Sequence, residues 1–169
     1  VSPEEMIGKF GKDGARYLLL SAAVFGEDID LSWERMTEKY NADLANGLGN
    51  LVSRVLKLAD RITNQEVRIT EKCVEHMPQE FLRLLENYRL NDGLEYIWDI
   101  VRKSNKYIED EKPWELAKTD TEKFETVMKK LLNDLSIIAH LLAPFLPETS
   151  ENIRTMLAER RGGILFQRI

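Results

Sequence analysis

Cysteine is almost absent from the sequence, and its scarcity excludes a disulfide framework. The single cysteine, Cys73, has no partner within the chain, and the two histidines, His76 and His140, lie too far apart in sequence to complete a zinc site with it. We therefore predict no bound metal. A lone cysteine is also typical of a reducing compartment, so we expect a cytoplasmic location.

Long apolar runs and an excess of positive charge are also missing. No run approaches the roughly 20 apolar residues of a membrane-spanning helix, so we expect no membrane partner. The formal net charge is −5, which argues against DNA or RNA binding through bulk charge, although a local basic row is compatible with RNA. With 169 residues, 43% of them hydrophobic, the chain is long enough to bury a core.

Glycine and proline are few, and most stand at the ends of apolar-periodic stretches, where they indicate helix boundaries. At the start of the chain, Ser2 and Glu5 have the spacing of a capping box, with Pro3 at the first helical position. This helix should end near Gly11, and Asp13 should cap a second short helix. No segment shows strand-like alternation.

Longer amphipathic helices follow. Ser32 is placed to cap a helix that reaches about residue 62 and carries one apolar face, formed by Leu44, Leu48, Leu51, Val52, Val55, Leu58, Ala59 and Ile62. Further helices are expected over 78–88, 90–112, 121–143 and 147–161, with Thr121 as a cap, a narrow apolar stripe along 121–143, and Gly162 and Gly163 closing the last helix. The sequence predicts an all-α, antiparallel helix bundle preceded by a small helical element.

Catalytic chemistry finds little support in these residues. A di-metal bundle needs two Glu-x-x-His pairs, and neither His76 nor His140 has a glutamate three residues before it. Cys73 has no nearby histidine on a helix to act as its base. We predict no catalytic residue and no metal ligand here.

Five polar residues fall on the side of the 32–62 helix opposite its apolar face, and we call them the polar ridge: Asn46, Asn50, Arg54, Lys57 and Arg61. Most such rows are solvated helix faces. Asparagine is a poor helix former, however, and two of them one turn apart cost helix stability without packing in return. Amides and a guanidinium on one ridge are suited to reading the edge of a base.

Tryptophan offers the second candidate. Trp33 and Trp98 are expected in the core, as most tryptophans are. Trp114 follows Pro113 at a break after an acidic run, where we expect a short turn to hold the indole at the surface as a stacking platform for an unpaired base. The alternative is that Trp114 is also a core residue.

Four motifs, in order, resemble the methionyl-tRNA synthetase family and together cover essentially the whole chain. They are the start of the chain, residues 1–7 with Gly11, Asp13 and 16–20; the segment 41–54; residues 105–108 followed by 112–118; and residues 144–151. The first resembles the stretch after the family's Lys-Met-Ser-Lys-Ser loop, the second its first anticodon-domain helix, the third its tryptophan motif and the fourth its last-helix start.

The resemblance implies that this chain has two parts and that catalysis belongs to a separate domain. Residues 1–30 would be a stem-contact element at the end of the catalytic region, and 31–169 an anticodon-binding helical bundle of the class I synthetase type. The catalytic domain, which uses ATP and Mg²⁺ to attach methionine, would precede Val1, so these residues alone should bind no cofactor and show no activity. The implied partners are the anticodon loop and inner stem of methionine tRNA, and the catalytic domain of the same chain.

Carried over position by position, the family's anticodon-binding residues correspond to Asn50, Arg54 and Trp114, with Asn46 in support. Lys57 and Arg61 extend the same ridge toward where the RNA backbone could pass. Methionine tRNAs share the anticodon CAU, and its cytosine has an edge that a guanidinium and an amide can match.

Three positions depart from the family pattern: Gly14 replaces a better helix former, Glu109 a common aspartate, and Gln167 a proline. Two other readings stay open. The chain could be the anticodon-binding domain of another class I synthetase, such as the leucine, valine or cysteine enzyme, or a non-catalytic helical interaction bundle.

Overall fold

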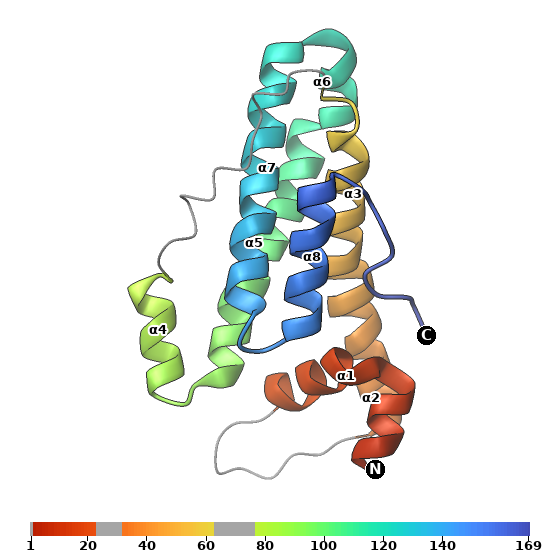
Figure 1. Ribbon diagram of the computed structural model, residues 1–169, viewed down its shortest axis with the longest axis vertical. Helices are drawn as coiled ribbons and strands as arrows, with labels where there is room; N and C mark the ends of the chain where they lie inside the picture. Colours follow the sequence, from red (N-terminus) through yellow and green to blue (C-terminus); the bar gives the residue numbers. More distant parts are fainter. Residues whose placement is uncertain (1, 23–31, 63–76) are drawn as a thin grey trace.

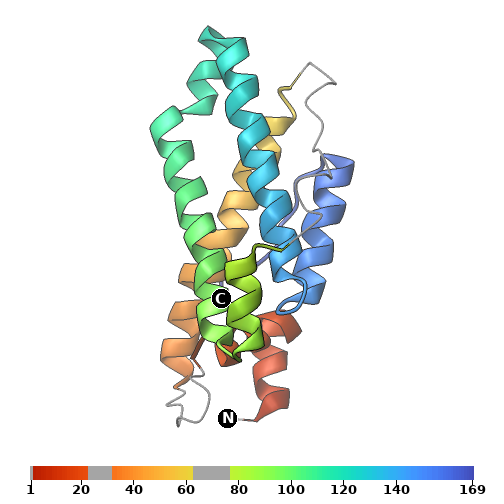
Figure 2. The ribbon, with the colours of Figure 1, turned by 90° about the vertical axis from the view of Figure 1, so that its left-hand side faces the viewer.

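The computed structural model describes residues 2–22, 32–62 and 77–169, and this part of the chain is helical, without strands. Its helices pack side by side into an elongated bundle (Figures 1 and 2), which confirms the predicted all-α class. The described elements are α1 (Pro3–Ala22), α2 (Trp33–Lys39), η1 (Tyr40–Gly49), α3 (Asn50–Ala59), α4 (Gln79–Glu86), α5 (Leu90–Glu111), α6 (Pro113–Thr119), α7 (Thr121–Leu142) and α8 (Pro147–Glu159). None of these helices is long and apolar enough to cross a membrane.

The predicted 32–62 helix is a continuous rod of α2, η1 and α3, and Ser32 caps it by accepting a hydrogen bond from the Arg35 amide at 3.3 Å. Its middle section, η1, is a π-helix, a wider winding that the sequence did not predict. A Cβ on Gly49 would stand 3.0 Å from the Leu44 carbonyl oxygen, and one on Gly47 would stand 3.3 Å from the Ala42 oxygen. Because glycine has no Cβ, it avoids these close contacts with the carbonyl oxygens of the wide turn.

The start of α1 agrees with the sequence. Ser2 N donates to Glu5 Oε2 at 2.8 Å and Glu5 N donates to Ser2 Oγ at 3.2 Å, which confirms the capping box. Gly11 breaks the helical path with φ 72°, where a helix end was expected. The prediction that Asp13 caps its own helix was wrong: its Oδ2 accepts instead from the Thr149 amide at 2.6 Å, in the first turn of α8.

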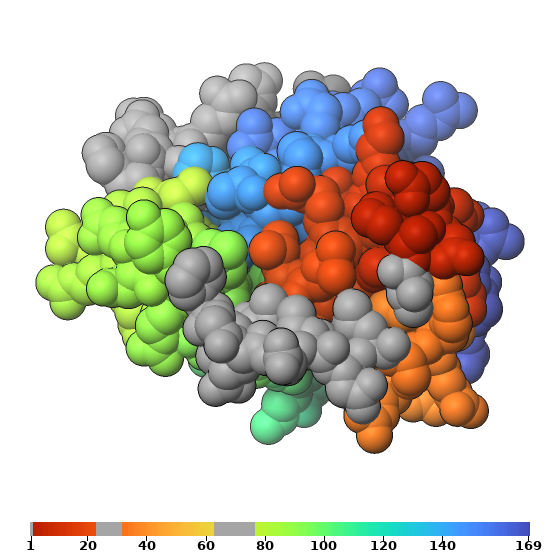
Figure 3. Space-filling view, turned by 90° about the horizontal axis from the view of Figure 1, so that it is seen from below, coloured from red at the N-terminus to blue at the C-terminus, as the bar shows by residue number. Residues whose placement is uncertain are grey.

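α1 docks on the turn between α7 and α8 through a second charged residue. Arg16 Nε donates to the Phe145 carbonyl oxygen at 2.7 Å, and its Nη2 donates to the Pro144 oxygen at 3.3 Å. From below, α1 lies against the atoms at this end of the bundle (Figure 3). Asp13 thus accepts a hydrogen bond from the amino end of α8, and Arg16 donates hydrogen bonds to the turn before it.

Gly14 has a packing reason in this structure. A Cβ there would stand 2.9 Å from Cε2 of Tyr40. The better helix former usual in the family would therefore displace the Tyr40 ring, which packs on Phe10 with ring centroids 5.5 Å apart.

The break before Trp114 follows the expected pattern, with one correction. α5 ends at Glu111, and Lys112 takes a left-handed conformation with φ 46° before Pro113. The next residues are not a turn, however: Pro113 stands at the start of a short helix, α6. Proline suits this place because its missing N–H has no partner in a first helical turn.

α7 differs from the expectation in two details. Its cap is Asp120, not Thr121, because Asp120 Oδ1 accepts from the Lys123 amide at 3.0 Å. Its buried side is also broader than the narrow stripe expected from Phe124, Val127, Leu131, Leu135, Ile138 and Leu142. It also includes Met128, Leu132, Ala139 and Leu141. This helix therefore lies near the centre of the bundle and faces several neighbours.

α8 begins at Pro147 as predicted, but it ends earlier than the glycine pair. Arg160 takes the left-handed conformation at its carboxyl end, with φ 50°, two residues before Gly162. The chain after α8, residues 161–169, is called the tail below. Figure 1 shows it returning along η1 and α3.

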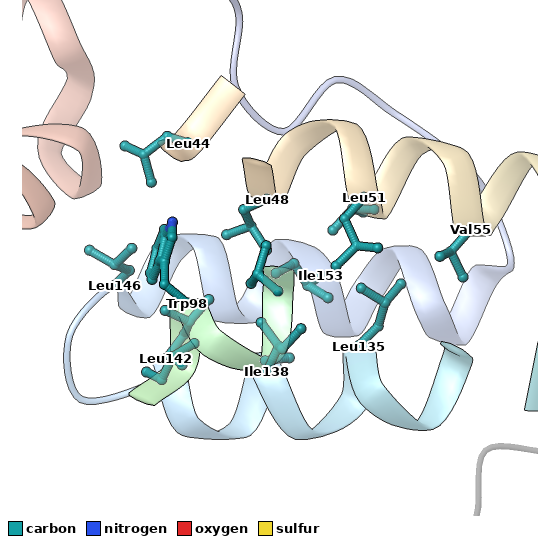
Figure 4. Close-up of a cluster of buried hydrophobic side chains, with 14 of the residues drawn as sticks. Leu44, Leu48, Leu51, Val55, Trp98, Leu135, Ile138, Leu142, Leu146 and Ile153 are labelled. Carbon is teal, nitrogen blue, oxygen red and sulfur yellow. The ribbon is translucent and has the colours of Figure 1, made fainter. Parts of the chain in front are cut away.

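The helices share one hydrophobic core, in which the predicted apolar face is confirmed. Of that face, Ile62 is half-buried and the other seven residues are buried. Figure 4 shows residues of η1 and α3 packing against α5, α7 and α8. Trp98 is a core residue as predicted, stacked on Tyr17 with ring centroids 4.5 Å apart, whereas Trp33 is half-buried against Phe10.

Candidate nucleic-acid interface

The polar ridge lies on the outer side of the η1–α3 rod, as predicted. Asn46, Asn50, Lys57 and Arg61 are exposed, and Arg54 is half-buried. The ridge begins on the π-helix with Asn46, passes Asn50 at the first residue of α3, and rises toward the end of the bundle that carries α6 (Figure 1). The two asparagines therefore stand at the point where the winding changes.

Arg54 and Trp114 come together from different elements. The Arg54 Cζ lies 6.0 Å from the centroid of the Trp114 ring, within range of a cation–π contact. Trp114 is half-buried and packs against the core, so it is neither the fully exposed platform expected nor a fully buried residue. Trp114 is therefore partly accessible to solvent.

Glu109, a residue without a predicted role, completes this cluster. Its Oε1 accepts from Arg54 Nη2 at 2.7 Å, with side chains 62% and 28% exposed respectively. Glu109 lies on α5, one turn before Pro113. Its single signal in the sequence was an acidic residue near the tryptophan motif, and nothing local indicated that it faces Arg54.

Asn105 is a second residue without a predicted role. Its Nδ2 donates to the Gly47 carbonyl oxygen and to the Val101 oxygen, each at 3.2 Å. The first bond ties α5 to the π-helix beneath the ridge. Asn105 thus binds the element that carries Asn46 and that leads directly into Asn50 of α3.

A pocket of about 350 Å³ opens beside the ridge. One wall is formed by Ala45, Asn46, Gly49, Asn50 and Ser53, and the other by Gly163, Ile164, Leu165 and Phe166 of the tail. In the sequence, the tail is recognisable only as an apolar end. Its return to the ridge could not be predicted, because no periodicity marks a segment without regular structure.

The site offers hydrogen bonds and stacking surfaces. Among the described residues, no three His, Cys, Asp or Glu side chains gather into a possible metal site. Cys73 and His76 lie outside the described residues. The half-buried His140 has its pKa lowered by burial and by the nearby Arg154 charge. Arginine, amides and an indole on one surface are suited to binding a nucleobase.

Comparison with known proteins gives two family matches that divide the chain. Residues 1–56 match the family described as tRNA synthetases class I (M), and residues 58–163 match the anticodon binding domain of methionyl tRNA ligase. The division falls inside α3, so the polar ridge spans both matches.

Individual relatives agree with these matches. A methionine–tRNA ligase of Clostridium acetobutylicum is 35% identical, over 93% of this chain and 26% of the relative, and one of Fusobacterium nucleatum is 34% identical, over 93% and 27%. The apo methionyl-tRNA synthetase of Mycobacterium tuberculosis has a similar structure, with a TM-score of 0.79 and 27% identity over 100% of this chain and 41% of that one. The chain thus spans about a quarter of these curated relatives. It belongs to the methionyl-tRNA synthetase family and contains the family's anticodon-binding domain.

Proposed function

We propose that this chain recognises the CAU anticodon of methionine tRNAs, contacting the anticodon loop and inner stem. The observation that carries the proposal is the Arg54 guanidinium, held between the Trp114 ring and the Glu109 carboxylate on the same ridge as Asn50. A catalytic region of the whole protein would then attach methionine using ATP and Mg²⁺, in the cytoplasm.

The cluster matches cytosine better than uracil. Unpaired cytosine exposes two acceptors, N3 and O2, beside an amino donor. Arg54 can donate to the acceptors, and Glu109 can accept from the amino group. Uracil presents an N3–H donor to the guanidinium and an O4 acceptor to the carboxylate, so both contacts become unfavourable. We expect this difference to disfavour uracil by about 1–3 kcal/mol.

The remaining ridge residues have supporting roles in this proposal. Asn50 lies one helical turn from Arg54 and supplies an amide to the same strand of RNA, with Asn46 a further turn away. Trp114, which is only half-buried, stacks on the base in this proposal. Lys57 and Arg61 are exposed cations farther along the rod, suited to backbone phosphates.

Residues 1–30 would form the stem-contact element and 31–169 the anticodon-binding bundle. In support, α1 binds the α7–α8 turn through Asp13 and Arg16, which joins the first segment to the bundle. No catalytic residue is proposed in this chain, so it should show no methionine-dependent exchange of pyrophosphate into ATP.

The two other readings are less well supported. The matches name the methionine family and not the leucine, valine or cysteine enzymes. A non-catalytic interaction bundle gives no reason for an arginine, an indole and two exposed amides to share one surface.

A binding titration tests the proposal. The 169-residue chain is titrated with a methionine-tRNA anticodon hairpin and with one that carries uracil as the first anticodon base. We expect tighter binding of the cytosine hairpin. Glu109→Gln should reduce this preference, because a glutamine amide can donate to uracil O4. Equal binding of both hairpins by the unsubstituted chain would contradict the proposal.

A further inference from the structure

α5 bonds the η1–α3 rod at two points that are one helical turn apart. Glu109 Oε1 accepts from Arg54 Nη2 at 2.7 Å, and Asn105 Nδ2 donates to the Gly47 carbonyl oxygen at 3.2 Å. Both side chains belong to one face of α5, because residues four apart on a helix lie one above the other. The first contact holds the arginine of the polar ridge, and the second lies beside its two asparagines.

The Gly47 carbonyl oxygen also fixes the backbone of Asn50. In an α-helix each amide donates to the carbonyl oxygen four residues earlier. The Asn50 amide donates instead to the Ala45 oxygen, five residues earlier, and to the Gly47 oxygen, three residues earlier. Because Asn50 is exposed, the direction of its side chain depends mainly on its backbone. The Gly47 carbonyl therefore helps to set where the Asn50 side chain points.

Asn105 is itself held in place. Its Nδ2 also donates to the Val101 oxygen at 3.2 Å, one turn earlier on α5, so one amide nitrogen bridges two helices. This second bond restricts the rotation of the side chain, which is half-buried. Trp98, seven residues before Asn105, has its Nε1 3.9 Å from where a Cβ on Gly47 would stand. α5 thus packs closely on Gly47 and binds its carbonyl oxygen.

We infer that Asn105 is a positioning residue for RNA binding: through the Gly47 carbonyl it directs Asn50 toward the RNA, and it does not contact the RNA itself. Both N–H groups of its amide are used within the protein. The inference rests on the proposed function, in which Asn50 supplies an amide to the bound strand. A positioning residue contributes to affinity only while the side chain that it positions is present. That dependence separates it from a residue that merely stabilises the bundle.

The test compares hairpin binding by single and double variants. Asn105→Ala removes the bond to Gly47. Asn105→Ser removes it too, since its side chain is one bond shorter, but keeps a hydroxyl that can donate to the Val101 oxygen. Ser104→Ala is the matched control on the neighbouring residue, because Ser104 Oγ donates to Asp134 Oδ2 at 2.9 Å and so ties α5 to α7 rather than to η1. Thermal melting records the folding stability of each variant.

We expect Asn105→Ala and Asn105→Ser each to weaken binding of the cytosine hairpin by about three- to tenfold, comparable to the contribution of one hydrogen bond. In a chain that already carries Asn50→Ala, the same substitutions should have almost no further effect, because the side chain that they misdirect is absent. In a chain that carries Lys57→Ala, farther along the ridge, they should keep their full effect. Ser104→Ala should lower the melting temperature and leave hairpin binding unchanged.

Three results would overturn the inference. Unchanged binding by both Asn105 variants would show that the bond to Gly47 does not matter for RNA. A loss that persists in full beside Asn50→Ala, or one that Ser104→Ala reproduces, would make Asn105 a general support of the bundle. Failure of the proposed function is distinguishable, since it appears as equal binding of the cytosine and uracil hairpins by the unsubstituted chain.

Discussion

At the scale of single residues, the ridge could be predicted but its partners could not. Helical periodicity places Asn46, Asn50 and Arg54 on one exposed side, and the structure agrees. Glu109 approaches Arg54 only because α5 packs beside α3, a contact between distant parts of the chain. Single-helix periodicity contains no information about such a pair.

The partial burial of Trp114 could not be predicted from periodicity either. Because of it, a substitution there should affect folding stability as well as binding. Trp114→Ala should weaken hairpin binding by about 1–3 kcal/mol through lost stacking. Because the ring is half-buried and packs on the core, the variant should also lose roughly 1–3 kcal/mol of folding stability. Titration and thermal melting measure the two effects. Unchanged binding alongside a lower melting temperature would make Trp114 a structural residue only.

Arg54 should differ from the cations that follow it on the ridge. Arg54→Ala should abolish the preference for cytosine over uracil, since this side chain is held at a fixed place by Glu109 and Trp114. Lys57→Ala and Arg61→Ala should weaken both hairpins alike and reduce the salt dependence of binding. Titrations of each variant at two salt concentrations separate the roles. Equal weakening by Arg54→Ala, with discrimination intact, would place base reading elsewhere.

At the scale of elements, helix positions followed from apolar spacing and from proline, but the winding of η1 did not. Apolar spacing does not show that the glycines at 47 and 49 stand close to carbonyl oxygens of a wider turn. The local caps at Ser2 and Ser32 were predicted correctly, whereas the cap of α7 is Asp120, one residue before the predicted Thr121. The predicted cap at Asp13 was wrong because the partner of Asp13, the Thr149 amide, lies on the last helix.

The π-helix gives a prediction with a built-in control. Gly49→Ala puts a Cβ 3.0 Å from the Leu44 oxygen, so we expect a loss of about 1–3 kcal/mol in folding stability and weaker hairpin binding. Gly8→Ala adds a Cβ on α1 with nothing within 4 Å and should raise stability by about 0.5–1 kcal/mol. Denaturant unfolding of both variants compares them. A Gly49→Ala variant as stable as the parent would show that η1 tolerates a side chain there.

The cap that Asp13 supplies to α8 can be measured in the same way. Asp13→Ala removes the acceptor for the Thr149 amide, and we expect a loss of about 1–3 kcal/mol because that buried N–H is left unpaired. Asp13→Asn retains an acceptor oxygen and should lose less. Lys12→Ala, which breaks only an exposed ion pair with Glu148, should cost little. Similar losses for all three variants would contradict the cap.

At the scale of the whole molecule, the all-α bundle followed from composition and periodicity, because each helix must bury its apolar side against another. The return of the tail, and its place as a wall of the pocket, did not follow from either. Order in the tail depends on Asn41, Tyr40 and Gly49, three residues of η1 with no signal in the tail's own sequence.

The shared core also predicts how the chain behaves when divided. Residues 58–163, the extent of the second family match, lack η1 and most of α3, whose leucines pack against α7 and α8 (Figure 4). We expect these residues alone to show no cooperative thermal transition, whereas the whole chain melts cooperatively. Circular dichroism during heating distinguishes the two. A cooperative melt of 58–163 would mean that the bundle core is complete without the first segment.

The bond between Asp13 and α8 has a thermodynamic consequence for the tail. α8 is bound at its first turn by α1 and leads at its other end into the tail that lines the pocket. RNA binding at the pocket that moved α8 would change the strength of the Asp13 bond, and linkage requires the reverse effect to be equal. Whatever displaces α1 from the bundle would then alter affinity at the pocket. A double-mutant cycle between Asp13→Asn and Asn50→Ala in hairpin binding measures this coupling directly.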